Sequence, residues 1–233
     1  MNEINLKEVQ QKLYEKLKPS GWDRVLRSFI MSQDFYNILD RLLLESNDGK
    51  KVTPLIKDMF RAFEECPYDK LKVVIIGQDP YPKQDVADGI SFSCSKSDVQ
   101  ASMRYMYTGI AGEGIISERP KDLACWSNQG VLMLNTALTC QIGHIGSHVE
   151  LWKPFTAYLF DMLKSLNTGI VYIFLGKKAE EYVDSIDADL NHALITSHPA
   201  SAAYSRLKEW NSNGVFTGCN NILKSLYNEQ IKW

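Results

Sequence analysis

The sequence has few cysteines, and they form none of the patterns that cysteines take in disulfide-rich or metal-binding proteins. No C-x-x-C pair occurs among the five, which are Cys66, Cys94, Cys125, Cys140 and Cys219. Their odd number and scattered positions argue against a disulfide framework, a zinc knuckle or an iron–sulfur cluster. We expect reduced and mostly buried thiols in an intracellular protein.

Long hydrophobic runs are also missing. No stretch of about 18 apolar residues occurs in the chain, so the sequence predicts no membrane-spanning helix. The first residues, M-N-E-I-N-L-K-E, are polar and acidic and have no apolar core, so a signal peptide is not expected. We expect a cytoplasmic protein without membrane contacts.

The chain has no excess of positive charge. Its 26 Lys and Arg residues and 28 Asp and Glu residues give a formal net charge of -2, so no global basic field indicates a nucleic-acid-binding protein. The charge does not exclude one, because a local cationic face can coexist with a near-neutral total. A hydrophobic content of 45% and a charged content of 23% are typical of a soluble globular protein.

Residues 1–66 are predicted to form an extra helical layer that is not a separate domain. Apolar residues recur at helical spacing over residues 4–18 and in a second helical region over about 22–45. Thr53-Pro54 predicts the start of a third helix, with a hydroxyl cap followed by proline at the first helical position. That helix would end at Cys66-Pro67.

The rest of the chain alternates strands and helices. Apolar runs predict buried strands at residues 73–76, 130–135, 170–175 and 193–196. Helices are predicted over about 97–110, 149–166, 176–180 and 217–227, the first of them capped by Ser97 or Asp98. Such alternation favours a central, mostly parallel four-stranded sheet between helical layers, a three-layer αβα fold. We predict one domain over residues 1–233.

The most informative stretch follows the first predicted strand and reads Gly77-Gln78-Asp79-Pro80-Tyr81-Pro82. The glycine frees the backbone to turn, and the two prolines prevent a helix or strand from continuing. Ligands of open α/β sheets bind just past the carboxyl ends of the strands, so this loop would bring a carboxylate, an amide and a ring to a binding crevice. The ordinary alternative is a stiff turn in which the aspartate caps the next helix.

Polar residues also follow the other predicted strands. Asn135 ends the second strand, Gly176-Lys177 follows the third, and His198 follows the fourth. Because parallel strands place their carboxyl ends at one edge of a sheet, these residues would converge on one pocket. Each has an ordinary explanation when taken singly, such as a turn cap or a loop histidine. Their common position after a strand favours a shared site, to which the loop tyrosine and Phe92 would add rings.

Four segments together carry a resemblance to a known family: residues 77–82 (G-Q-D-P-Y-P), 89–93 (G-I-S-F-S), 131–135 (V-L-M-L-N) and 197–199 (S-H-P). They resemble segments of family 1 uracil-DNA glycosylases. The resemblance extends to residues 122–130 and to Ser147-His148, and it covers about residues 53–218. The G-Q-D-P-Y block with its downstream phenylalanine is the most specific part.

The resemblance implies an enzyme that flips deoxyuridine out of DNA and hydrolyses its N-glycosidic bond, leaving an abasic site. Asp79, as a carboxylate, would stabilise an oxocarbenium-like sugar and position or activate water. His198 would donate a hydrogen bond to the uracil oxygen on which negative charge grows, and it need not be protonated. Backbone N–H groups near Gln78 would add to this stabilisation. No metal and no cofactor is implied.

The family also implies how uracil would be selected. Asn135 would pair with uracil N3–H and O4, a pattern that cytosine reverses. Tyr81 would fill the space that the methyl group of thymine needs, and Phe92 would stack on the flipped ring. Gln78 completes the predicted substrate-binding set.

DNA contacts are expected from loops. By resemblance, phosphates on either side of the extruded base would be gripped by Pro80, Ser102, Gly176, Lys177 and Ser201. Lys177 stands where the family often carries a small hydroxyl residue. It is either a solvated lysine at a helix start or a direct phosphate contact.

One position departs from the family. The loop after the His-Pro pair usually carries a bulky aliphatic residue that enters the DNA stack, but Ala202 stands there. Two hypotheses follow: Tyr204 takes over as a DNA-contacting wedge, or flipping depends on capture of a base that is already open.

Three alternatives compete with a uracil-DNA glycosylase. A catalytically weak relative would act as a DNA-binding accessory or replication subunit, but its signature would be the loss of Asp79 or His198, and both are present. An unrelated nucleotide-binding protein would need a phosphate loop, and none follows any predicted strand. A mismatch-type glycosylase would usually lack the full Gln-Asp-Pro-Tyr set.

The partners expected from the resemblance are DNA and a protein that imitates it. The substrate would be uracil-containing DNA, single- or double-stranded, and a DNA-mimic inhibitor protein is a further candidate partner. The chain is expected to act as a monomer.

Overall fold

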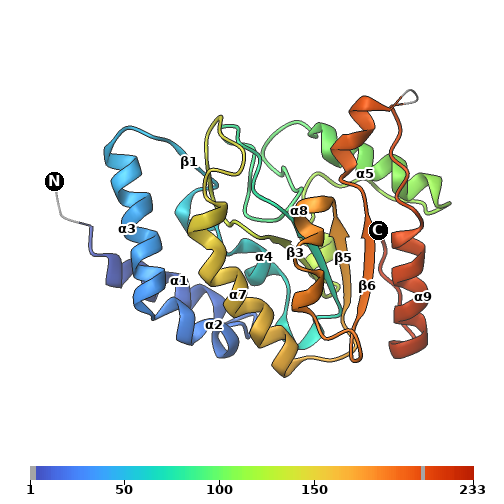
Figure 1. Cartoon of the computed structure of the whole chain (residues 1–233), viewed down its shortest axis with the longest axis horizontal. Helices are drawn as coiled ribbons and strands as arrows, with labels where there is room; N and C mark the ends of the chain where they lie inside the picture. Colours follow the sequence, from blue (N-terminus) through green and yellow to red (C-terminus); the bar gives the residue numbers. More distant parts are fainter. Residues whose placement is uncertain (1–3, 206–207) are drawn as a thin grey trace.

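The structure is a computed structural model that describes residues 4–205 and 208–233. Its centre is a four-stranded sheet in the order β3-β2-β5-β6 (Figure 1), and all neighbouring strands are parallel. The strands are β2 (Val73–Gly77), β3 (Val131–Asn135), β5 (Val171–Leu175) and β6 (His192–Thr196). Helices flank the sheet, so the predicted αβα fold with a parallel four-stranded sheet is confirmed.

The register of the sheet aligns the carboxyl ends of its strands. Gly77 of β2 pairs with Asn135 of β3, and Leu175 of β5 pairs with Thr196 of β6. Strands β2 and β5 are buried along their whole length, because their Val, Ile and Leu side chains pack on both faces of the sheet. The prediction that residues 193–196 form a buried strand is wrong in its burial, because β6 is an edge strand and only its last residue, Thr196, is buried. The loops that follow all four strands therefore leave from one edge.

Several helices and turns surround the sheet. The helices are α4 (Arg61–Glu65), α5 (Ala101–Gly112), α6 (Ala124–Ser127), α7 (Val149–Leu166), α8 (Lys177–Glu180) and α9 (Val215–Tyr227). The 3-10 turns are η1 (Ile56–Asp58), η2 (Tyr68–Lys70), η3 (Val183–Ser185) and η4 (Pro199–Tyr204). Helices α4 and α6 contact β3, α9 contacts β5 and β6, and α5 contacts η4.

The N-terminal layer consists of α1 (Leu6–Leu17), α2 (Asp23–Ile30) and α3 (Gln33–Asn47). The predicted helical region over 22–45 is thus two helices, because Ser32 is extended and its Oγ accepts a hydrogen bond from Phe35 N–H at 3.2 Å. Helices α2 and α3 contact α7, for example through the rings of Phe29 and Phe155, whose centroids are 5.4 Å apart. The prediction of one domain over residues 1–233 stays a prediction.

The predicted helix start at Thr53-Pro54 is wrong. Thr53 ends a short strand, β1 (Val52–Thr53), which pairs antiparallel with β4 (Cys140–Gln141). Thr53 pairs with Cys140, a residue far along the chain, so a tertiary pairing replaces the local capping signal. The turn η1 and the short helix α4 follow instead of one continuous helix.

The helix predicted from residue 97 begins later than expected, at Ala101, with Gln100 at the N-cap. Neither Ser97 nor Asp98 caps it. Ser97 N–H instead donates to the Cys94 carbonyl at 3.1 Å, so this part of the segment forms a turn. A local side-chain signal therefore placed the helix a turn too early.

The cysteines are free, as predicted, and all except Cys125 are buried. Burial raises the pKa of Cys66 to about 12 and that of Cys140 to about 12, which keeps both thiols protonated and unreactive. Among residues 4–205 and 208–233, no helix combines the length and the apolar character needed to cross a membrane.

Candidate active site

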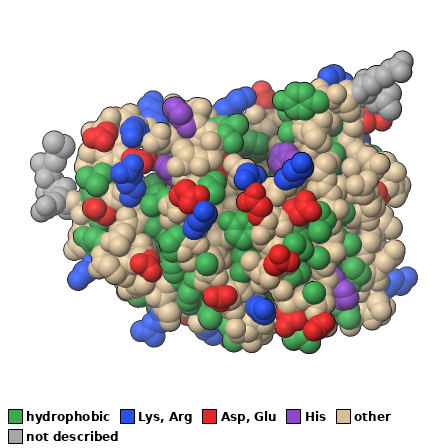
Figure 2. Space-filling model, in the orientation of Figure 1, with side chains coloured by type: hydrophobic (Ala, Val, Ile, Leu, Met, Phe, Trp, Pro, Cys, Tyr) green, Lys and Arg blue, Asp and Glu red, His purple; other side chains and the backbone are tan. Residues whose placement is uncertain are grey.

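A cavity of about 500 Å³ opens at the carboxyl edge of the central sheet, a size typical of small-ligand sites. Most of the predicted site residues line it: Gln78, Asp79, Pro80, Tyr81, Phe92, Ser102, Asn135, Gly176, Lys177 and His198. In Figure 2, blue and purple side chains border a hollow in the upper part of the face. The structure brings these residues together, and their individual roles stay predictions.

Asn135 lies at the end of β3, and its neighbours set the direction of its amide. Ser91 Oγ donates a hydrogen bond to Asn135 Oδ1 at 2.7 Å, which holds the amide in the orientation observed. A Cβ atom on Gly77 would lie 2.6 Å from Ser91 Oγ and 2.7 Å from Asn135 Oδ1, so this pair requires glycine at position 77. The oriented amide offers an acceptor and a donor side by side, as the imide edge of a pyrimidine needs.

Asp79 is half-buried in the loop after β2, and its two carboxylate oxygens have different partners. Gly146 N–H donates to Oδ2 at 2.5 Å, and Gln78 Nε2 donates to Oδ1 at 3.3 Å. Burial raises the pKa of Asp79, and these two hydrogen bonds and the nearby His148 counter that effect. The carboxyl group is therefore partly dehydrated, while its contacts favour the ionised form.

His198 follows β6, and its ring has a defined tautomer. Ala200 N–H donates to His198 Nδ1 at 3.1 Å, so the proton of the neutral ring is on Nε2. Burial lowers the pKa of His198 below its ordinary value of 6.5, which favours this neutral form. A Cβ atom on Gly176 would lie 2.8 Å from His198 Cβ, so the approach of β5 to the histidine also depends on a glycine.

Tyr81 and Ser102 are joined by a hydrogen bond that bears on the predicted phosphate contact of Ser102. Tyr81 OH donates to the carbonyl of Phe92 at 3.1 Å and lies 2.7 Å from Ser102 Oγ. Because the tyrosine proton goes to the carbonyl, Ser102 is the donor in the second bond. A phosphate contact by the Ser102 hydroxyl would therefore require this bond to be exchanged.

Phe92 is held in a strained backbone conformation with φ +63°. Its segment is fixed by the buried Asp88, which accepts hydrogen bonds from Ile90 N–H at 3.2 Å and Ser93 Oγ at 2.7 Å. Arg61 Nη1 pairs with the same carboxylate at 3.1 Å. The ring centroids of Phe92 and His198 are 5.6 Å apart, which leaves the two rings as neighbours in the cavity wall.

Ser201 and Tyr204, both in η4, lie outside the cavity lining. Ser201 Oγ donates to Ser197 Oγ at 3.3 Å, and the side chain of Tyr204 is 93% exposed. Ala202 is buried, with 2% of its surface exposed, so the residue at the family's wedge position does not face solvent. Of these residues, Tyr204 is the one that projects from the molecule.

Lys177 and Lys178 bring positive charge to the cavity lining at the start of α8. Lys178 Nζ also pairs with Glu181 at 2.7 Å. Within the part of the chain that the structure describes, no group of three or more His, Cys, Asp and Glu side chains is arranged to hold a metal ion.

Three residues of the site had no role in the sequence-based prediction. Ser91 orients Asn135, Gly146 binds Asp79, and the apolar Ile145 lines the cavity although its side chain is 73% exposed. The position of Ser91 beside Phe92 was a signal that could have identified it. Gly146 and Ile145 come from the loop between β4 and α7, where only the glycines stood out.

The fold and the cavity together define a class of protein. It is an α/β protein with a cavity of small-ligand size, lined by a carboxylate, an amide and an imidazole, at the carboxyl edge of a parallel sheet. The family model described as "Uracil DNA glycosylase superfamily" matches residues 63–224. The chain belongs to the uracil-DNA glycosylase superfamily.

Two curated relatives are similar to almost the whole chain. "Uracil-DNA glycosylase" of Wolinella succinogenes is 34% identical over 221 residues, which is 94% of this chain and 94% of the relative. "Uracil-DNA glycosylase" of Acinetobacter baumannii is 32% identical over 240 residues, covering 99% of this chain and 98% of the relative.

Solved structures with the same fold include the crystal structure of mimivirus uracil-DNA glycosylase. It has a TM-score of 0.84 and 26% sequence identity, and the match covers 99% of this chain and 89% of that chain. UNG from Nitratifractor salsuginis has a TM-score of 0.60 at 20% identity, covering 90% of this chain and 96% of that one. This second likeness shows the fold alone.

Proposed function

We propose that this protein is a uracil-DNA glycosylase, which hydrolyses the N-glycosidic bond of deoxyuridine in DNA, releases uracil and leaves an abasic site. The observation that carries the proposal is that Asp79, Asn135 and His198 all line one cavity. The two curated relatives, at 34% and 32% identity, support it. A non-catalytic accessory subunit is disfavoured, because the carboxylate and the imidazole are both kept.

Asp79 acts on the sugar and on water. Cleavage of the glycosidic bond develops positive charge on the deoxyribose, and a negative charge in a partly dehydrated site stabilises it more than the same charge in water. The hydrogen bond from Gly146 N–H holds Oδ2 in place. The carboxylate also accepts a proton from the water that attacks the sugar carbon.

His198 acts on the leaving group. Nε2 carries the proton because Nδ1 already accepts from Ala200 N–H. A neutral N–H donor aimed at the uracil oxygen stabilises the charge that grows there as the bond breaks. The lowered pKa of the ring, caused by burial, keeps it a neutral donor at physiological pH.

Asn135, Tyr81 and Phe92 select the base. The amide of Asn135, oriented by Ser91, matches the N3–H and O4 of uracil, and cytosine would leave one of these buried groups unpaired. Tyr81 excludes a methyl group on the ring, and Phe92 stacks on it. Gln78 contacts the same ligand through its backbone or side chain.

The finer assignment to family 1 is part of the proposal. It is supported by the block at residues 77–82, by its spacing to Phe92 and by the S-H-P segment. We also place the protein in the cytoplasm, because its substrate is DNA, and consider it a monomer. One solved relative is a mimivirus UNG variant in complex with UGI. This supports a DNA-mimic inhibitor protein as a partner that would bind the surface around the cavity.

DNA on either side of the flipped nucleotide contacts Pro80, Gly176 and Lys177 at the cavity, and Ser201 and Tyr204 of η4. Ser102 joins this set through its backbone N–H, since its hydroxyl is bonded to the tyrosine. Tyr204 acts as the wedge that fills the gap in the duplex, a role for which its full exposure suits it.

The Tyr204 wedge can be tested with duplex and single-stranded uracil DNA. Tyr204→Ala should lower kcat/KM on duplex DNA by about tenfold and leave the single-stranded substrate almost unchanged, because only the duplex has a stack to fill. Tyr204→Leu should restore most of the loss. Equal losses on both substrates would reject the wedge.

The enzyme activity is tested by incubating wild-type protein and Asp79→Asn with uracil-containing single-stranded DNA, followed by cleavage of abasic sites in alkali. Wild type should release uracil, and the variant should lose about 10³-fold or more in turnover while DNA binding is largely kept. A folded wild-type protein that leaves deoxyuridine intact would overturn the proposed function.

A further inference from the structure

Glu45 is a buried carboxylate in the N-terminal helix α3, outside the cavity lining. Only 5% of the residue is exposed, which is unusual for glutamate unless it is paired. Arg41 Nε donates to Oε1 at 3.0 Å. Two further groups meet at the other oxygen, Oε2: Gln141 Nε2 at 3.0 Å and His148 Nε2 at 2.9 Å.

Gln141 and His148 stand at the two ends of one loop. Gln141 ends β4 and His148 directly precedes α7, so the Glu45 oxygen Oε2 joins the beginning of the loop to its end. A second bond closes the loop from within, since Gln141 N–H donates to Ser147 Oγ at 2.8 Å. The clamp therefore consists of one carboxylate oxygen from the N-terminal layer and two partners seven residues apart in the chain.

The clamped loop is the one that holds the reacting carboxylate. Gly146, within the loop, donates its N–H to Asp79 Oδ2 at 2.5 Å. Gly146 has φ +76°, a conformation that favours glycine, so the direction of this N–H depends on how the loop is folded. The same loop also donates from Gly143 N–H to the Pro82 carbonyl at 2.8 Å.

We propose that Glu45 is a positioning residue for the reaction: by clamping both ends of loop 141–148, it fixes the Gly146 N–H that orients and stabilises the Asp79 carboxylate. This inference rests on the proposed glycosylase function. It gives the N-terminal helical layer a part in catalysis, although none of its helices lines the cavity.

Behind the clamp, hydrogen bonds hold the His148 ring from both sides. Trp152 Nε1–H donates to Thr139 Oγ1 at 2.8 Å, and Thr139 Oγ1 lies 2.9 Å from His148 Nδ1. With the His148 proton on Nε2, facing Glu45, the Thr139 hydroxyl donates to Nδ1 and each donor has an acceptor. A glutamine at position 45 has one acceptor oxygen, and its amide nitrogen is a donor. It could therefore not accept hydrogen bonds from all of the groups that now donate to Glu45.

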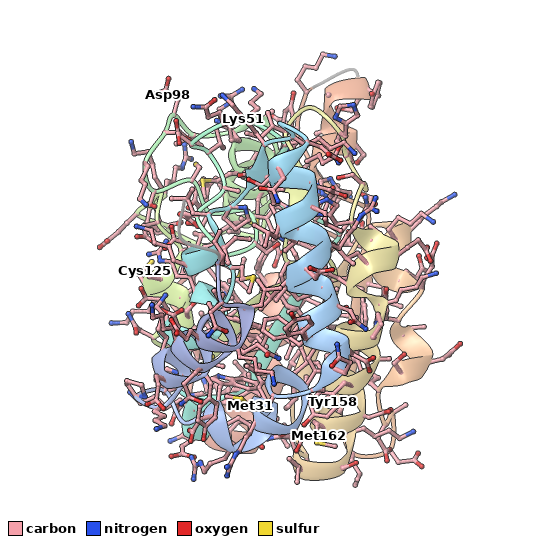
Figure 3. All side chains as sticks on the ribbon, turned by 90° about the vertical axis from the view of Figure 1, so that its left-hand side faces the viewer. Met31, Lys51, Asp98, Cys125, Tyr158 and Met162 are labelled. Atoms are coloured by element: carbon pink, nitrogen blue, oxygen red, sulfur yellow. The ribbon has the colours of Figure 1, made fainter. Side chains whose placement is uncertain are left out.

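The position of α3 in the molecule agrees with this role. In Figure 3, α3 faces the viewer and runs from the level of Met31, at the lower end, toward Lys51 at the upper end, with α7 beside it. Glu45 lies in the last turn of α3. The clamp thus joins the end of one helix to the start of another, and these two helices also contact each other.

The test compares Glu45→Gln and Glu45→Ala with the control Arg41→Ala, which removes the partner of Oε1 and leaves the bonds at Oε2. Uracil release is measured as kcat and KM across pH, with thermal melting to confirm folding. Glu45→Gln should lower kcat by about tenfold to 100-fold with KM changed less than about threefold, and Glu45→Ala should lose more. Arg41→Ala should stay within about twofold of wild type.

The pH profile separates positioning from a general loss of structure. Losing the Gly146 bond disfavours the ionised form of Asp79, so the acid limb of kcat should move to higher pH in Glu45→Gln. The other charged or titratable groups around Asp79 are Lys177, Lys178 and His198 across the cavity and Cys140 and His148 behind it.

Because Glu45→Gln also changes the surroundings of His148, a second variant isolates the loop. Ser147→Ala opens the loop closure without changing any charge, and it should move the acid limb in the same direction by a smaller amount.

A Glu45→Gln protein with wild-type kcat and an unmoved acid limb would overturn the clamp. So would an equal loss in Arg41→Ala, since a general effect on α3 would then explain both. An inactive wild-type protein would instead reject the proposed function itself, so the two failures are distinguishable.

Discussion

At the residue scale, Ser91 and Asn135 show how a neighbour sets what a side chain can recognise. An amide that rotated by half a turn would offer its donor where an acceptor is needed. In the observed orientation the hydroxyl of Ser91 donates to Oδ1, and the missing side chain of Gly77 leaves room for the pair. In the proposed function, discrimination between uracil and cytosine would therefore depend on a serine and a glycine as well as on the asparagine.

Ser91→Ala should lower kcat/KM for uracil by about fivefold, because one hydrogen bond worth about 1 kcal/mol no longer orients the amide. The ratio of uracil to cytosine release should fall as well. The measurement is base release from matched oligonucleotides that contain one or the other base. Ser201→Ala, which removes an exposed hydroxyl outside the cavity, should leave the ratio unchanged, and a loss of the ratio there would contradict the assignment.

The pH dependence of activity follows from two groups that must both be deprotonated. Burial raises the pKa of Asp79 above 3.8, and burial lowers the pKa of His198 below 6.5. Activity should therefore rise with pH along an acid limb that lies above the ordinary carboxyl pKa of 3.8 and then level off once both groups are deprotonated.

A profile of kcat/KM from about pH 4 to 8 tests this prediction. A profile that is level over this whole range would contradict the raised pKa of the Asp79 carboxyl group. In His198→Asn, which has no group that titrates in this range, the remaining limb should report the carboxyl group alone.

At the element scale, the segment that carries Phe92 is held by charge inside the protein. Arg61 of α4 pairs with Asp88 and with Asp122, whose Oδ2 lies 2.7 Å from Nη2. Asp88 is almost fully buried and also accepts from Ser93 Oγ. Helix α4 is short, but through this arginine it ties the segment of Phe92 to the residues before α6.

Arg61→Ala should destabilise the protein by about 2 kcal/mol, because it leaves the Asp88 charge buried without its cation while its other hydrogen bonds remain. For a chain of this length the melting temperature should fall by about 5 °C. KM for uracil DNA should rise, since the Phe92 segment loses its anchor.

The matched control is Arg24→Ala, which breaks an exposed pair with Asp69 at 2.9 Å, whose side chains are 60% and 79% exposed. That change should cost less than about 0.5 kcal/mol. If both variants melted at the same temperature, the buried pair would not be the source of stability in this segment.

At the scale of the whole molecule, the net charge of -2 implies that DNA binding relies on a few local contacts. The lysines that line the cavity are Lys177 and Lys178. Each phosphate neutralised on duplex DNA contributes about -0.9 to the slope of log K against log salt. A protein with two such contacts should show a slope of about -2, much shallower than that of a strongly basic DNA-binding protein.

Lys177→Ala should make this slope shallower by about 0.9. Binding is measured by titration in the Asp79→Asn background, so that the substrate is not cleaved. Lys12→Ala, on α1 and away from the cavity lining, should not change the slope. An unchanged slope in Lys177→Ala would support the alternative of a solvated lysine at the helix start.

The sequence by itself determined the sheet and the main polar groups of the cavity. Buried parallel strands need continuous apolar runs, so β2, β3 and β5 could be recognised as such locally, whereas β6 is mostly exposed. Parallel strands necessarily place their carboxyl ends together. The loop at residues 77–82, Asn135 and His198 each directly follow or end such a run. Their meeting was therefore predictable before any contact was known.

Only the tertiary structure decided which groups support these residues. Ser91 meets Asn135 across 44 residues of chain, and Gly146 meets Asp79 across 67. No local pattern marks such pairs, because they form only when loops from different strands are brought to one edge. The same holds for the pairing of Thr53 in β1. The type of a polar group and its place after a strand can be predicted from neighbouring residues. The orientation of a reacting group depends on distant parts of the chain that pack against it.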